Sequence, residues 1–205
     1  MDISLNLTGI IVVIVCLVVS ITLHEMMHAF VGLKLGDTTA QEQGRISLNP
    51  LNHIDPFATV LLPIITLVLF RAPILAAKPV PFDPARVKFA EFGAAMIAAA
   101  GPLTNLVLAA IGGLVAHVVG VDAGIYNVIY AFVSINVALF VFNLIPIPPL
   151  DGSRVLYAFA PEALQDLMAQ MEQVGFFIIF ALVLFVRPFG DTLVNIIQTV
   201  TNALL

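Results

Sequence analysis

Long apolar runs separated by short polar or proline-rich segments dominate the chain. The first run, residues 10–36, supplies the roughly 20 apolar residues that a helix needs to span a bilayer. Residues 89–119 and 125–142 are also long enough, and 174–186 is a shorter final candidate. The pattern therefore predicts an all-α polytopic membrane protein, a bundle of about 4–6 membrane helices.

The composition supports this class. Of the 205 residues, 60% are hydrophobic and only 10% are charged, and the mean hydropathy is +1.08, which excludes an ordinary soluble domain. The net charge of −5 is spread over short loops, which argues against nucleic acid as a partner. We expect one integral membrane domain over residues 1–205, with its core at about 10–155 and C-terminal helices over 156–205.

The segment after the first helix has the least regular pattern. Residues 38–48 are polar, alternate in part and contain the central Gly44, which predicts a short β-hairpin. Residues 57–70 are apolar, but they are few and Pro63 interrupts them. Because basic residues flank this run on both sides, we expect a re-entrant segment rather than a span.

Basic residues also predict the orientation. Lys34 and Arg45 follow the first helix, whereas the first eight residues contain no Lys or Arg. By the positive-inside rule, the far end of this helix faces the cytoplasm. We therefore expect a multi-pass protein of the cell membrane, whose first helix is retained rather than removed as a signal peptide.

The last third of the first helix contains a metal-binding motif, His24-Glu25-Met26-Met27-His28. Histidines four residues apart project from the same helix face and can bind one ion. In H-E-x-x-H sites the imidazoles hold zinc, a third ligand comes from elsewhere, and the Glu acts as general base on water. Hydrogen bonding between helices is the alternative, but ionisable groups within a membrane usually mark function.

Asp151 is the leading candidate for the third ligand. Three prolines precede it within residues 143–150, which predicts an unwound segment followed by a new helix. If 57–70 is re-entrant, the spans 89–119 and 125–142 cross the membrane in opposite directions. Asp151 then lies on the same side of the membrane as the histidines. Asp151 is also a candidate helix cap, and four rival ligands stay open: His53, Asp55, Asp83 and Glu91.

Two motifs together resemble the site-2 protease family of intramembrane zinc metalloproteases, in its compact type without a PDZ or CBS domain. They are His24-Glu25-x-x-His28 and Asn143-x-x-Pro146-x-x-x-Leu150-Asp151-Gly152. Further similar segments are Asn49-Pro50-Leu51, His53-Ile54-Asp55-Pro56, Ala77-Lys78-Pro79-Val80-Pro81 and Gly101-Pro102-Leu103-Thr104-Asn105. The resemblance implies one Zn²⁺ per chain on His24, His28 and Asp151, with Glu25 acting on water. It also implies that Asn143 and Asn105 help to hold or polarise the substrate peptide.

We therefore expect an intramembrane zinc endopeptidase that cleaves transmembrane segments of membrane proteins near the cytoplasmic face, in regulated intramembrane proteolysis. A non-proteolytic zinc scaffold or sensor is the main alternative, although a structural site more often uses four protein ligands and has no need of Glu25. A transporter is disfavoured because we find no convincing internal repeat. The substrate, a regulatory membrane partner and homo-oligomerisation stay open.

Overall fold

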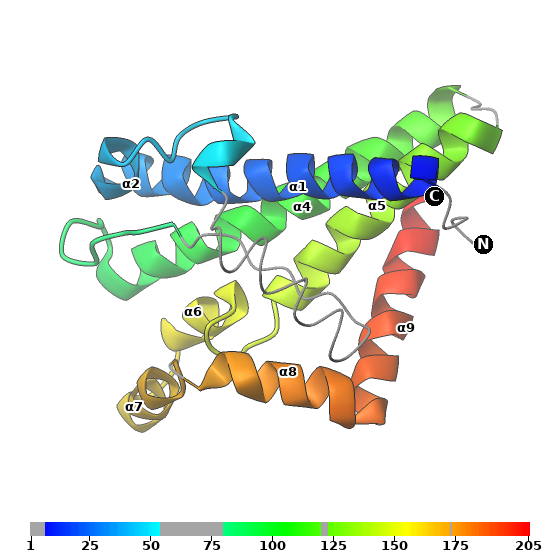
Figure 1. Cartoon of the computed structure of the whole chain (residues 1–205). Helices are drawn as coiled ribbons and strands as arrows, with labels where there is room; N and C mark the ends of the chain where they lie inside the picture. The colour runs from blue at the N-terminus through cyan, green and yellow to red at the C-terminus, as the bar shows by residue number, and fades with distance from the viewer. Residues whose placement is uncertain (1–6, 54–79, 120–122, 173) are drawn as a thin grey trace.

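The computed structural model describes residues 7–53, 80–119, 123–172 and 174–205 (Figure 1). Within these ranges every regular element is helical, which confirms the predicted all-α class. Three helices are long and apolar enough to cross a membrane: α1 (Leu7–Lys34), α4 (Ala90–Val119) and α5 (Ala123–Asn143). A fourth span would require the bent pair α7 (Glu162–Met171) and α8 (Gly175–Phe185) to count as one. The described residues therefore do not test whether the protein has five or six membrane helices.

Helix α4 is the centre of the membrane bundle, because it packs against both α1 and α5. Most of its buried positions early in the helix are small, among them Ala94, Ala95, Ala98, Ala100 and Gly101. Small side chains allow helix backbones to approach closely in lipid, where no hydrophobic effect drives helices together. This close approach brings the histidine-bearing face of α1 against α4.

The predicted β-hairpin over residues 38–48 is wrong. The described residues of this segment form a short helix, α2 (Thr39–Glu42), and turns that lead into the 3₁₀ helix η1 (Pro50–Asn52). The carboxylate of Asp37 accepts hydrogen bonds from the backbone N–H and the hydroxyl of Thr39, which favours a helical turn at this point. The predicted re-entrant segment 57–70 lies outside the described residues.

Asp37 also links the end of α1 to the segment that enters α4. Its second carboxylate oxygen accepts a hydrogen bond from the backbone N–H of Asp83 at 2.9 Å. Burial by itself would raise the pKa of the Asp37 carboxyl, but the hydrogen bonds from Thr39 and Asp83 hold that pKa below its usual range. The N–H of Lys88 completes the link by donating to the carbonyl of Leu35.

The C-terminal helices support the bundle from one side. Helix α6 (Asp151–Tyr157) packs against α4, and α9 (Arg187–Leu204) packs against α5. On α9, Ile197, Val200 and Leu204 contact the buried cluster of Ala109, Val133 and Val137. These apolar residues of α9 therefore cover part of α4 and α5.

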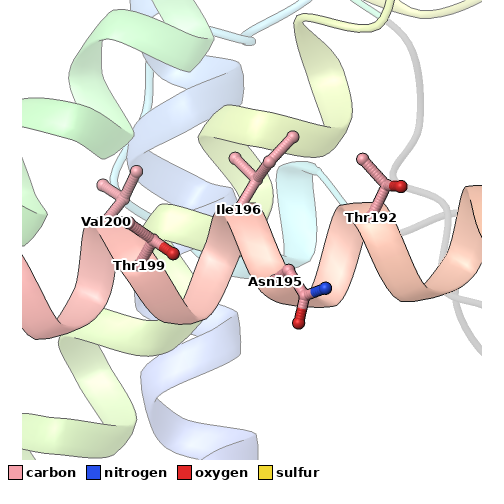
Figure 2. A pocket seen from close by; sticks show the side chains of 5 residues that line it. All are labelled: Thr192, Asn195, Ile196, Thr199 and Val200. Carbon is pink, nitrogen blue, oxygen red and sulfur yellow. The ribbon is translucent and has the colours of Figure 1, made fainter.

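The surface of α9 also carries an open pocket of about 280 Å³. Thr192, Asn195, Ile196, Thr199 and Val200 line this pocket (Figure 2). None of them is a predicted site residue, so this pocket is separate from the chemistry considered below.

Candidate metal centre

The two histidines of the motif lie on the buried face of α1. His24 and His28 are each only 6% exposed, and Glu25 between them is 8% exposed. Their four-residue spacing stacks the rings edge to face with centroids 4.6 Å apart, and the two Nε2 atoms are 3.0 Å apart. Both side chains therefore present the same ring nitrogen to one small volume.

Asp151 reaches this volume from the first residue of α6. Its Oδ2 atom lies 3.3 Å from Nε2 of His24 and 3.4 Å from Nε2 of His28. The helix cap is Leu150 rather than Asp151. Burial would raise the pKa of the Asp151 carboxyl, but the two neighbouring histidines, His28 above all, hold it at about 2, so the group is an anion at neutral pH.

The space beside these atoms exists because residue 101 on α4 is glycine. A Cβ atom at Gly101 would lie 2.3 Å from Nε2 of His28 and 2.6 Å from Nε2 of His24. Zinc binds imidazole nitrogen at about 2.0–2.1 Å, so the cradle is of the size that an ion needs. Two nitrogens and one carboxylate oxygen form the three-ligand set of catalytic zinc sites, which keep a fourth position for water. The donor set therefore fits zinc.

The chain is similar in sequence to proteins named as zinc metalloproteases. The model of Peptidase family M50 matches residues 115–186. A Bacillus subtilis protein named "Putative zinc metalloprotease YwhC" is 38% identical over 187 residues, which cover 87% of this chain and 81% of that protein. The chain belongs to the M50, or site-2 protease, family.

More distant relatives of this M50 protein carry a similar name. "Putative zinc metalloprotease Rip2" of Mycolicibacterium smegmatis is 30% identical over 181 residues, 85% of this chain and 67% of that protein. The protein of the same name in Mycobacterium tuberculosis H37Rv is 32% identical over 177 residues, 83% of this chain and 64% of that protein. No solved structure matches the chain. Family membership makes zinc the expected metal, in agreement with the donor set.

The rival ligands that the structure describes lie elsewhere. Within the described residues, the group of metal-ligating side chains that converges is His24, His28 and Asp151, whose ligand atoms all lie within 4.8 Å of one another. His53 is buried, and its Nε2 forms a hydrogen bond with the carbonyl of Ser47. Asp83 forms an ion pair with Arg86. Asp55 lies outside the described residues.

The two asparagines expected to contact substrate lie in different surroundings. Asn105 is fully buried, and its Oδ1 atom lies 2.6 Å from Nδ1 of His24. Asn143 is partly exposed, and its side-chain amide donates to the carbonyl of Leu139 on the same helix. Asn105 therefore contacts a candidate metal ligand directly, and the substrate role of both asparagines stays a prediction.

Three residues with contacts to the site were missed as site residues by sequence reasoning. Arg45 was interpreted only as an orientation signal, yet it is 2% exposed and close enough to Glu25 for their charges to interact. Ser20 and Asn136 are fully buried polar residues within apolar helices. Their position within apolar helices could have identified them from the sequence, because a polar group inside a membrane helix needs a partner.

Proposed function

We propose that this M50 protein is an active zinc endopeptidase that hydrolyses peptide bonds within transmembrane segments of membrane proteins. The observation that carries the proposal is the convergence of His24, His28 and Asp151 on a space that only a glycine at position 101 leaves open. A purely structural zinc site more often has four protein ligands.

Glu25 is the proposed general base. When bound, zinc lowers the pKa of a water molecule to about 7 and polarises the scissile carbonyl. Glu25 is buried beside the three ligands and interacts electrostatically with all of them. It is therefore placed to take a proton from water and to deliver it to the leaving amine.

The proposed site faces the cytoplasm. Basic side chains gather where α1 ends: Lys34 closes the helix, and Lys88 is joined to it through the backbone of Leu35. His28 lies less than two turns before Lys34, so by the positive-inside rule the metal centre is near the cytoplasmic surface. Cleavage is accordingly expected in the cytoplasmic part of a substrate helix.

The substrate must be partly unwound before it is cut, because helical carbonyls are engaged in internal hydrogen bonds. The described part of residues 38–53 contains no strand, so addition of the substrate to a strand edge there is not part of the proposal. Asn143, on the last turn of α5 before the segment that leads to Asp151, is the proposed polar contact for the substrate backbone.

The experiment compares Glu25→Gln with Glu91→Gln, an exposed control at the start of α4. Each variant and the wild type are co-expressed with a panel of single-span membrane proteins, and zinc content is measured after purification. We expect Glu25→Gln to retain zinc and to lose cleavage by at least about 100-fold, whereas Glu91→Gln keeps both. Normal cleavage by Glu25→Gln would refute the mechanism. A wild type that binds zinc and cleaves nothing in the panel would favour the scaffold alternative.

A further inference from the structure

A chain of buried hydrogen bonds leads from His24 away from the metal centre. Nδ1 of His24 lies 2.6 Å from Oδ1 of Asn105 on α4, and Nδ2 of Asn105 donates to Oδ1 of Asn136 on α5 at 2.9 Å. Nδ2 of Asn136 donates to two acceptors at 2.9 Å, Oγ of Ser20 and the carbonyl of Phe132. Ser20, Asn105 and Asn136 are each 0% exposed, so bulk water does not compete for these bonds.

The orientation of the two asparagine amides is determined at Asn136, the asparagine farther from the metal centre. The carbonyl of Phe132 can only accept a hydrogen bond, so Asn136 must turn its NH₂ group toward it. The oxygen of Asn136 then faces Asn105, which must in turn present its own NH₂ group. A second backbone acceptor, the carbonyl of Ser20 at 3.4 Å from Nδ2 of Asn105, favours the same orientation.

These amide orientations determine which ring nitrogen of His24 carries the proton. With its NH₂ group turned to Asn136, Asn105 offers His24 only an oxygen, and Nδ1 of His24 must then carry the ring proton to make the 2.6 Å bond. The other nitrogen, Nε2, is left without a proton and faces Asp151 and His28. A neutral imidazole needs this tautomer to bind a metal through Nε2.

We infer that Asn136 is a positioning residue of the metal centre, which acts through Asn105 to keep the ring proton of His24 on Nδ1 and Nε2 free for the ion. The inference rests on the proposed metal site. His28 needs no such relay, because its Nδ1 donates directly to the carbonyl of Ile97 at 2.7 Å. His24 has its tautomer determined by side chains, so a single substitution on another helix can change it.

A purely structural role for Asn136 predicts different behaviour. Buried asparagines commonly join membrane helices through hydrogen bonds, and the loss of such a bond weakens the fold without selecting a histidine tautomer. The two roles are therefore separated by a measurement on the His24 ring and by a variant that keeps the acceptor toward Asn105.

The test uses Asn136→Leu, Asn136→Asp and the packing control Val137→Ala, which removes buried volume from the next residue of α5. Each full-length protein is purified in detergent without metal. Its imidazole ¹⁵N spectrum is recorded over a pH series, and the affinity for Co²⁺ is measured by absorption. Asn136→Ala replaces the leucine variant if the latter does not fold.

We expect the wild type and Val137→Ala to hold the His24 proton on Nδ1. Asn136→Leu should give a mixture of tautomers and bind Co²⁺ at least about 10-fold more weakly, the usual cost of losing an outer-shell partner of a ligand. Asn136→Asp should restore the wild-type tautomer, because its carboxyl oxygen still accepts from Asn105.

An unchanged His24 tautomer in Asn136→Leu would overturn the inference, as would an equal change in Val137→Ala. The ring measurement is made without metal and does not depend on proteolysis. A wild type that keeps the tautomer but binds no Co²⁺ would therefore refute the proposed metal site and leave the relay from Asn136 to His24 established.

Discussion

Gly101 of α4 lies so close to His28 of α1 that a Cβ atom on it would be 2.3 Å from Nε2 of the imidazole. Real side chains do not approach a ring nitrogen this closely, and the nearest atoms belong to the two histidines rather than to mobile side-chain ends. The glycine therefore determines how much room an ion has between the helices.

Gly101→Ala should lose the metal because the added methyl group takes the place of the ion. We expect a stability cost of about 1–3 kcal/mol and a fall in Co²⁺ affinity of at least about 10-fold, measured by absorption titration. The matched control is Gly32→Ala, where the new Cβ would meet only Cδ1 of Ile97 at an ordinary 3.7 Å. Full zinc content in Gly101→Ala would show that the space is not used by the ion.

Asp151→Asn should greatly weaken zinc binding, because it replaces an anionic ligand by a neutral amide. Loss of an outer-shell partner costs 10–100-fold in affinity, so loss of a direct ligand should cost at least about 100-fold. Zinc content after dialysis against a chelator is the measurement. Asp166→Asn, an exposed site on α7, should bind zinc as the wild type does, and equal zinc in both variants would remove Asp151 from the ligand set.

Asp37→Asn should destabilise the protein at neutral pH and much less in acid. The amide cannot accept from both Thr39 and the N–H of Asp83, and an unsatisfied buried donor costs about 1–3 kcal/mol. The folded-state pKa of Asp37 is below its unfolded value. Its stabilisation is therefore complete above the unfolded pKa of about 3.9 and is lost as the pH falls through the folded pKa.

Thermal unfolding of the wild type and Asp37→Asn in detergent, measured from neutral pH down to below pH 4, checks this dependence. The gap between the two melting temperatures should narrow only at the acid end. A gap that stays constant over the whole range would mean that the charge of Asp37 contributes nothing.

Gly113→Ala should loosen the docking of α9 without affecting the metal centre. A Cβ at this position would lie 2.2 Å from the carbonyl oxygen of Leu204, so the backbone at the end of α9 has to move. We expect a loss of about 1–3 kcal/mol in unfolding free energy with zinc content unchanged, and Gly32→Ala again serves as the control. Loss of zinc in Gly113→Ala would show that α9 supports the site from a distance.

The ligand set was accessible from the sequence because each part has a local signature. Four-residue spacing places His24 and His28 on one face of a helix whatever the tertiary structure, and a proline-rich break before Asp151 marks where the chain unwinds. Their roles as ligands stay predictions, but the structure brings the three side chains together.

The parts that were not predicted correctly depend on tertiary contacts. The alternation in residues 38–48 favoured strands, whereas the hydrogen bonds of Asp37 to Thr39 and Asp83 select a helical turn. Asn105 was assigned only to the substrate, because its neighbour on α1 cannot be known before the helices are packed. The side-chain partners of Asn136 come from two other helices, so its place in the network cannot be predicted before the helices are packed.

The candidate ligands lie on two helices, α1 and α6, and this affects how the stabilities of variants are compared. A bound ion would link α1 to α6, two helices that are far apart in the sequence. A ligand that binds only the folded state raises the unfolding midpoint. Two preparations of identical sequence, one exposed to a chelator, should therefore melt at different temperatures. Differences between variants are interpretable only at matched metal occupancy.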